Sequence, residues 1–345
     1  MLDHGALAAP IVGAPMAGGP STPRLAAAVS DAGGLGYLAG AYISAERLTE
    51  DVRAVRELTD ASFGVNLFVP EERPSDREAV ARYAQALRPL AERWGVSVPA
   101  AVPDSDDGFG EKLAVLIEAA VPAVSFTFGC PPAATIERLH AVGTAVTVTV
   151  TTADDARTAA SAGADALCVQ GAAAGGHRST FAVAEQPNDL EAEELLALVR
   201  DVCDLPLVAA GGVRDHADVR RLLGAGAVAV QVGTALLLTP EAGTKPAHRA
   251  ALVDPARDRT AVTRAYSGRP ARGLLNAFIE QFDALAPAEY PQVNTMTGAL
   301  RRAAADDPDV LNLWAGTGFT AAREASVADV VRALAGHDDL DDAVG

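Results

Sequence analysis

The sequence predicts a single α/β domain, a (β/α)₈ TIM barrel with a helical insertion after the third strand and a cap region towards the C-terminus. Three observations favour this fold. Eight short apolar runs lack the polar alternation of half-exposed strands, as expected for parallel strands covered on both faces. Helix start and stop signals lie between these runs. The alternations together occupy about 240 residues, the size of a closed barrel. An open doubly wound sheet is the alternative arrangement of the same units.

The predicted strands are rich in Val, Ile, Leu and Ala and are bounded by Gly, Pro or polar residues. In chain order they are Ile11–Ala14, Leu35–Ala39, Phe63–Phe68, Ala123–Phe128, Ala145–Val150, Ala166–Gln170, Leu207–Ala210 and Ala227–Val232.

Helix N-caps are predicted where Ser, Thr or Asp precedes an apolar stripe of helical spacing. The predicted caps are Thr22, Ser44, Ser75, Thr152 and Asp215, of which Ser75 and Thr152 have capping-box spacing to Glu78 and Asp155.

Two stretches exceed a minimal barrel. Residues 71–118 read as a helix-rich insertion, and residues 237–318 carry Pro-, Gly- and Arg-rich loops that we expect to cap the barrel mouth on the substrate side. We therefore expect the barrel to comprise residues 1–236 and 319–336, followed by an acidic tail at 337–345.

The charge balance argues against nucleic acid or an anionic membrane as a partner. The chain has 28 Lys and Arg against 45 Asp and Glu, a net charge of −17, which would repel a polyanion. An anionic cofactor must then be held by local donors such as backbone amides.

The remaining composition indicates a cytoplasmic protein. There are 3 cysteines and no C-x-x-C pair, which fits a reducing compartment. The N-terminus lacks a basic and apolar leader, and no apolar run approaches the roughly 20 residues of a membrane span. No metal-spaced Cys/His cluster occurs, so no metal site is predicted.

Strands seven and eight both end in glycine, in a fold whose phosphate sites commonly follow these two strands. Gly211 and Gly212 follow strand seven, and Gly233 and Thr234 follow strand eight. Glycine lets backbone amides approach phosphate oxygens, and a helix start with a hydroxyl adds further donors. The alternative is that these glycines only make tight turns; their occurrence in consecutive units favours a phosphate site.

The segment after strand six is the most informative. Gln170 ends the strand, and Gly175 and Gly176 let the backbone pass close to a flat cofactor just before His177. Histidine suits proton transfer near neutral pH, and catalytic groups of barrels lie at strand ends. We therefore predict that His177 is catalytic. The other histidines are interpreted as structural or surface residues: His4, His140, His216, His248 and His337.

Polar residues inside apolar strands are candidates for ligand contact. Asn66 lies within strand three and Gln170 ends strand six, and a buried amide costs free energy unless it finds partners, which a flavin edge offers. The alternative is an amide bonded to neighbouring backbone. Cys130 has no paired histidine in the sequence and is interpreted as a small buried residue.

Six blocks, in order along nearly the whole chain, resemble one family. They are APMAGGPSTPRLAAAVSDAGGLG (14–36), VNLF (65–68), QGAAAGGHRSTF (170–181), AAGGV (209–213), QVGTALL (231–237) and YSGRPARGLLN (266–276). They resemble the nitronate monooxygenases, formerly called 2-nitropropane dioxygenases. The G-G-H-R and S-G-R-P-A-R-G blocks are the specific ones, whereas the P-M opening and the A-G-G turn are shared more widely among flavin barrels.

The resemblance implies FMN bound non-covalently at the barrel mouth and the oxidation of alkyl nitronates by O₂ to carbonyl compounds and nitrite. It implies that His177 is the catalytic histidine and would act as base on a neutral nitroalkane, with Arg178 or backbone donors orienting the anion. The implied FMN contacts are Asn66, Gln170, Gly175, Gly212, Gln231, Val232, Gly233 and Thr234, with Ala14 and Met16 bordering the ring.

Two positions depart from the family pattern. Ser179 follows Arg178 where glycine is usual, and Thr317 stands in LWAGTGF where glutamine is expected. We expect both in loops that touch substrate, so they bear on specificity. The FMN- and NADH-dependent enoyl-acyl-carrier-protein reductases, which share the G-G-H turn, are the main alternative, and a flavin-free phosphate-binding barrel lyase or isomerase is another.

Overall fold

The computed structural model describes residues 2–336, and its centre is a closed barrel of eight parallel strands. The strands are β1 (Ile11–Gly13), β2 (Gly36–Ala39), β3 (Phe63–Phe68), β4 (Ala123–Thr127), β5 (Ala145–Val150), β6 (Ala166–Gln170), β8 (Leu207–Ala210) and β9 (Ala229–Val232). Their order is β1-β9-β8-β6-β5-β4-β3-β2, and a parallel bridge from Val12 to Leu35 joins the last strand back to the first. All eight predicted strands are confirmed, and the bridge rules out the open sheet.

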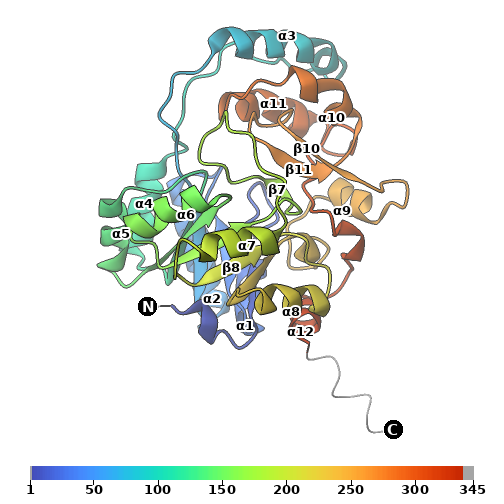
Figure 1. The fold of residues 1–345 in the computed structure, drawn as a ribbon. Coiled ribbons are helices and arrows are strands. Elements are labelled where there is room, and N and C mark those ends of the chain that lie inside the picture. The colour runs from blue at the N-terminus through green and yellow to red at the C-terminus, as the bar shows by residue number, and fades with distance from the viewer. Residues whose placement is uncertain (1, 337–345) are drawn as a thin grey trace, which may run out of the picture.

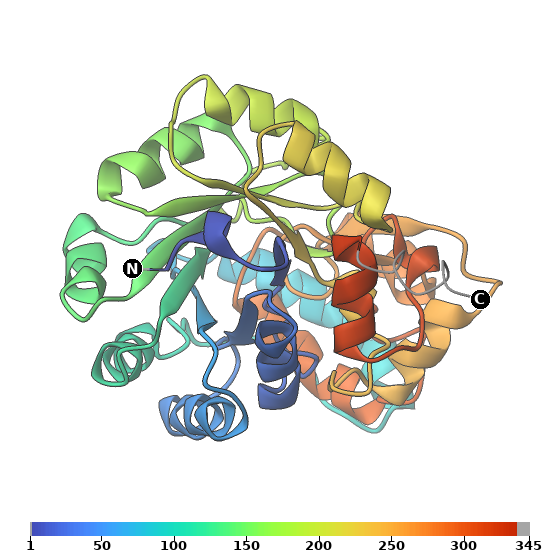
Figure 2. The same ribbon diagram turned by 90° about the horizontal axis from the view of Figure 1, so that it is seen from below.

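Helices pack around the outside of these strands, as the view from below shows (Figure 2). They are α1 (Pro23–Asp31), α2 (Ala45–Leu58), α4 (Phe109–Glu118), α5 (Ala133–His140), α6 (Ala153–Ala162), α7 (Ala192–Arg200), α8 (His216–Gly224) and α12 (Val327–Ala335). The last of these packs against α1 and α8 and so takes the eighth helix position after the chain has left the barrel and returned.

Four of the five predicted N-caps are confirmed. The side chains of Thr22, Ser44, Thr152 and Asp215 each accept a hydrogen bond from a backbone amide of the first helical turn. The prediction of Ser75 is wrong, because Asp76 is the N-cap of α3 (Arg77–Arg93) and accepts from the amide of Ala79. A carboxylate one residue further along also complements the positive end of the helix.

A second lobe lies over the carboxyl ends of the strands, at the top of Figure 1. It contains α3, α9 (Pro246–Val253), α10 (Ala277–Phe282), α11 (Gln292–Ala303) and a three-stranded antiparallel sheet of β10 (Thr260–Thr263), β11 (Ala271–Leu274) and β7 (Gly176–His177). Single 3₁₀ turns lie at His4–Ala6, Thr234–Leu236, Asp283–Leu285 and Phe319–Ala321. We call the second lobe, formed by α3, α9, α10, α11 and the three-stranded sheet, the cap.

The predicted insertion at 71–118 is divided between the two lobes. Tyr83 and Leu87 of α3 share an apolar core with Tyr266, Phe278 and Val293 of the cap. Helix α4 instead packs against α2 and β3 as a barrel helix. We therefore propose that α3 belongs to the cap, although the whole of α4, β4, α5, β5, α6 and β6 lies between it and the next cap element, β7, in the chain. The predicted acidic tail, residues 337–345, lies outside the described residues.

Among the helices of residues 2–336, none combines the length and the apolar character needed to span a membrane.

Candidate active site

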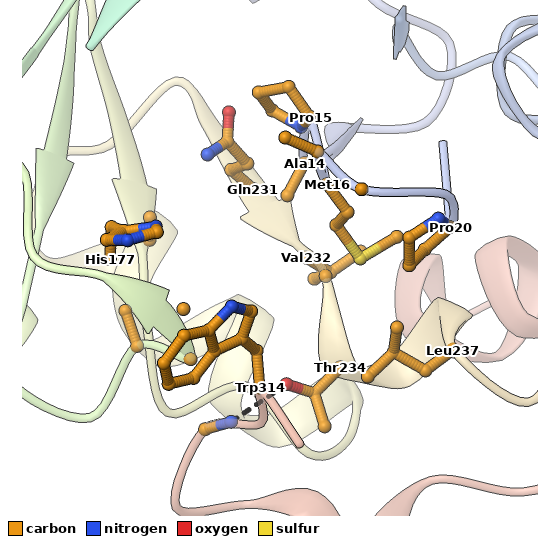
Figure 3. A pocket seen from close by; sticks show the side chains of 18 of the residues that line it. Ala14, Pro15, Met16, Pro20, His177, Gln231, Val232, Thr234, Leu237 and Trp314 are labelled. Carbon is orange, nitrogen blue, oxygen red and sulfur yellow. Dashed lines mark hydrogen bonds between the residues drawn. The ribbon is translucent and has the colours of Figure 1, made fainter. Parts of the chain in front are cut away.

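A cavity of about 260 Å³ lies between the carboxyl ends of the strands and the cap. Residues from β3, β4, β5, β6, β8 and β9 and from the segment that follows β1 form its floor, and residues from α11 and the segment 311–318 form its far wall. The predicted catalytic histidine and all predicted FMN contacts line this cavity: Ala14, Met16, Asn66, Gln170, Gly175, Gly176, His177, Gly211, Gly212, Gln231, Val232, Gly233 and Thr234. Figure 3 shows His177, Gln231 and Trp314 around it.

His177 is held in place from two sides. It belongs to β7, which pairs with β11 of the cap, so its backbone is part of the cap sheet. The imidazole Nε2 of His177 lies 2.8 Å from the hydroxyl of Ser267. The side-chain amide of Gln170 donates from its Nε2 to the backbone carbonyl of His177 at 3.0 Å. The Gln170 Oε1 also accepts from the amide of Ser179 at 2.9 Å. Gln170 thus ties together the two ends of the turn that carries His177.

Aromatic rings surround the imidazole of His177. Phe128 and Trp314 have ring centroids 5.4 and 5.6 Å from it, and Phe68 and Tyr290 both lie at 6.4 Å. These side chains come from β3, from the end of β4 and from the cap, so the apolar wall around His177 forms only when both lobes are in place. The wall limits the water that can reach the imidazole.

Two arginines lie close enough to His177 to lower its pKa, and one of them, Arg269, is paired with the carboxylate of Glu71 at 3.5 Å. The guanidinium of Arg269, 1% exposed, stacks 4.1 Å from the Phe128 ring centroid and donates to the carbonyl of Thr180 at 2.8 Å. Arg301 of α11 lines the cavity and donates to oxygens of Asn294 and Asn312. Burial, reinforced by the charges of Arg269 and Arg301, lowers the pKa of His177 to about 3. The imidazole is therefore neutral at physiological pH.

The glycines at the strand tips leave backbone amides available. Gly211 and Gly212 have φ of +110° and +75°, which L-residues rarely adopt. Within the described residues, no backbone acceptor pairs with the amide of Gly212 or Gly233. The Thr234 hydroxyl accepts from the amide of Gly316 at 3.0 Å, drawn as the dashed line in Figure 3.

Gly175 marks a close approach between two backbone segments. A Cβ at this position would lie 2.4 Å from the nitrogen of Gly316 and 2.5 Å from the carbonyl carbon of Ala315. A side chain here would push apart the turn that carries His177 and the segment that carries Trp314. A Cβ on Gly176, by contrast, would meet no heavy atom within 4 Å.

The side-chain amides that line the cavity differ in how many hydrogen bonds they make. Asn66, 2% exposed, donates from Nδ2 to Ser125 and Thr127, while its Oδ1 makes no hydrogen bond within residues 2–336. The Gln231 amide likewise has no partner in the described part of the chain, and Figure 3 shows it reaching into the cavity. Gln170, as described above, is occupied in holding the turn.

Three expectations near His177 are wrong. Arg178 does not line the cavity but is buried on the opposite face, where it donates to the carbonyl of Asn188 at 3.0 Å. Successive side chains of a strand point to opposite faces, so a residue next to His177 cannot share its orientation. Ser179 and Thr317 also lie outside the cavity lining. Ser179 is fully buried and accepts from the amide of Phe128, and Thr317 donates its amide to the carbonyl of Ala173.

Several lining residues were not found from the sequence. They come from the cap and have no local motif: Lys245, His248, Asn294, Arg301 and Asn312, whereas Trp314 lies within the LWAGTGF segment quoted from the sequence. His248, interpreted as structural or surface, is buried against the cavity, and burial lowers its pKa to about 4. Cys130 does not line the cavity, and burial raises the pKa of its thiol to about 11, which leaves it protonated. In residues 2–336, no three His, Cys, Asp or Glu side chains are grouped to hold a metal ion.

Comparison with known proteins assigns the chain to a family. The model of the family described as nitronate monooxygenase matches residues 2–336. The chain belongs to the nitronate monooxygenase family. It is 43% identical to the nitronate monooxygenase of Pseudomonas aeruginosa, over 94% of this chain and 95% of that protein. The family membership makes it an oxidoreductase.

Solved structures agree with this assignment. A structure titled as the nitroalkane oxidase from Streptomyces ansochromogenes matches with a TM-score of 0.91 and 43% identity, covering 96% of both chains. FabK from Thermotoga maritima matches less well, with a TM-score of 0.74 and 27% identity over 95% of this chain and 92% of that chain.

Proposed function

We propose that this enzyme uses FMN to oxidise alkyl nitronates with O₂, releasing a carbonyl compound and nitrite. The observation that carries the proposal is a single cavity in which a neutral His177 faces the glycine tips of β8 and β9. The names of the similar proteins from Pseudomonas aeruginosa and Streptomyces ansochromogenes support the same class of substrate.

The cavity fits FMN in two respects. The amides of Gly212 and Gly233, which have no partner among residues 2–336, and the Thr234 turn can hold the phosphate. They are the local donors that a chain of net charge −17 requires. The free Oδ1 of Asn66 and the free amide of Gln231 can pair with the polar edge of a flavin. We propose that Ala14, Met16, Val232, Gly175, Gly176 and Gly211 complete this site. When bound, FMN supplies the electron transfer from substrate to O₂.

The protein's own part is to bind and orient an anion. A nitronate carries its negative charge over a carbon and two oxygens, and the positive charge of Arg301, which lines the cavity, would stabilise that charge. The charge of Arg269 is partly offset by Glu71, whose carboxylate lies 3.5 Å from its guanidinium. His177 presents a polar ring to the cavity among these aromatic side chains, so we propose that it sets the position of the substrate. With a neutral nitroalkane, His177 would also remove the α-proton. Its low pKa makes it a weak base, so we propose that nitronates are the better substrates.

The test begins with the absorbance spectrum of the purified protein, which should show a bound flavin. Oxygen uptake is then measured separately with a primary alkyl nitronate, with its parent nitroalkane and with NADH, together with nitrite release. We expect rapid uptake and nitrite with the nitronate, slower uptake with the nitroalkane and none with NADH. A colourless protein that rejects added FMN would contradict the cofactor, and NADH oxidation driven by an enoyl thioester would contradict the reaction.

The role of His177 is tested with His177→Asn. This variant should retain flavin and lose roughly a hundredfold or more of its rate on the neutral nitroalkane, because a general base contributes at least that factor. The loss on the nitronate should be smaller, since that substrate needs no proton removal. Unchanged rates on both substrates in a flavin-loaded variant would show that His177 is not at the reacting centre.

A further inference from the structure

The hydroxyl of Ser267 has three polar neighbours within hydrogen-bond distance but only one proton to donate. Its Oγ lies 2.8 Å from Nε2 of His177, 3.2 Å from the carbonyl oxygen of Arg269 and 3.3 Å from the amide nitrogen of Arg269. Ser267 is 1% exposed, so water does not supplement these contacts from bulk solvent. A serine hydroxyl has one proton to donate and two lone pairs to accept with.

The neighbours decide where that proton goes. The Arg269 amide can only donate, so it occupies one lone pair of Ser267. The Arg269 carbonyl can only accept, and among residues 2–336 the Ser267 hydroxyl is its one hydrogen-bond donor. Leaving a buried carbonyl unpaired costs about 1–3 kcal/mol, so the Ser267 proton is best directed to Arg269. The second lone pair of Ser267 then accepts a hydrogen bond from Nε2–H of His177.

We propose that Ser267 is a positioning residue that holds His177 in the tautomer with its proton on Nε2, so that Nδ1 offers its lone pair to the ligand. Nδ1 makes no hydrogen bond within the described residues, and the side chain lines the cavity. The arrangement suits a group that gains and loses a proton. When Nδ1 is protonated, the Nε2–H to Ser267 bond remains as it was, so no rearrangement accompanies the transfer.

The tautomer itself depends only on the geometry around Ser267, and its consequence for catalysis rests on the proposed function. It can be measured in the holoenzyme at neutral pH by ¹⁵N NMR with labelled histidine, because ring nitrogens with and without a proton differ strongly in chemical shift. The spectrum of His177→Asn identifies the His177 signals. We expect an unprotonated Nδ1 and a protonated Nε2. The reverse assignment, or a mixture of both tautomers, would overturn the inference.

Three variants test the positioning role. Ser267→Ala should convert the His177 signals to a mixture of tautomers and lower kcat for the neutral nitroalkane by roughly fivefold to tenfold, as for the loss of one hydrogen bond, with a smaller change in KM. Ser267→Thr keeps the hydroxyl and should restore both the wild-type signals and kcat. Ser161→Ala removes an exposed hydroxyl on α6 and should change neither. Wild-type His177 signals in Ser267→Ala would overturn the role of Ser267.

The two proposals fail in different ways. A wild-type protein that oxidises neither nitronate nor nitroalkane would refute the proposed function, while the NMR result would still decide the tautomer.

Discussion

Replacing Gly175 with alanine tests whether the close approach of two backbone segments sets the geometry of the site. The new Cβ would lie 2.4 Å from the nitrogen of Gly316, whereas ordinary contact begins near 3.4 Å, so the segments must separate by about 1 Å. The atoms it meets are backbone atoms of Ala315 and Gly316, which cannot turn aside as a flexible side chain can. Overpacking of this kind costs about 1–3 kcal/mol of stability.

The functional cost should be larger than the cost in stability. The turn that Gly175→Ala displaces carries His177. The displaced amide of Gly316 donates a hydrogen bond to the hydroxyl of Thr234, at the end of the cavity where we propose that the FMN phosphate binds. A displacement of about 1 Å can lower the rate about a hundredfold, so we expect kcat/KM for the nitronate to fall by about that factor. Flavin content should also fall.

The measurements are the thermal midpoint, the flavin absorbance per protein and oxygen uptake. The matched control is Gly110→Ala in α4, where a Cβ meets no heavy atom within 4 Å and alanine should stabilise the helix by roughly 0.5–1 kcal/mol. If Gly175→Ala matched Gly110→Ala in midpoint, flavin content and kcat/KM, the close approach would have no part in shaping the site.

Three further predictions concern the cavity walls. Asn66→Leu leaves the hydroxyls of Ser125 and Thr127 without their amide partner, so it should cost about 1–3 kcal/mol of stability, measured by the thermal midpoint. It should also lower the flavin content, measured by absorbance, and an unchanged flavin content would contradict the proposed contact. Arg301→Met should raise KM for the anionic nitronate more than for the neutral nitroalkane in steady-state oxygen uptake, and an equal change for both would contradict an electrostatic role. The folded-state pKa of His177, about 3, lies below its ordinary value of 6.5, so burying it neutral contributes stability above pH 6.5 that is lost as pH falls towards 3. The thermal midpoint of the apoprotein should therefore fall on acidification, and less steeply in His177→Gln; equal slopes would show that His177 is not the group responsible.

The barrel was predictable because its signals are local. Each strand is a continuous apolar run such as Ala145–Val150, and β1 and β9 lie next to each other because a parallel eight-stranded sheet closes on itself. The cavity floor followed from the same rule, since strand ends carry ligands in this fold. The N-cap of α3 was missed by one residue, because Ser75 and Asp76 are both good caps and the sequence does not show which one ends the extended segment.

The cap side of the site was not predictable in the same way. Arg301 and Lys245 reach the cavity through packing between segments far apart in the chain, and no short motif indicates them. The partnership of Ser267 with His177 likewise requires the pairing of β7 with β11. The position of Arg178 was a different case: the alternation of side chains along a strand was enough to place it on the face away from His177.

The pairing of β7 with β11 limits how this enzyme can admit its substrate. Many enzymes close over a ligand by swinging a lid about a hinge. Here His177, the proposed catalytic histidine, is itself a member of the cap sheet, so a swing of the whole cap would pull it away from the barrel mouth. Entry is better served by small rotations of the rings at the rim, such as Tyr42 and Tyr290, whose hydroxyls lie 3.4 Å apart. Grafting a foreign cap onto this barrel to change its specificity would therefore have to bring along a strand that fits the turn of residues 171–179.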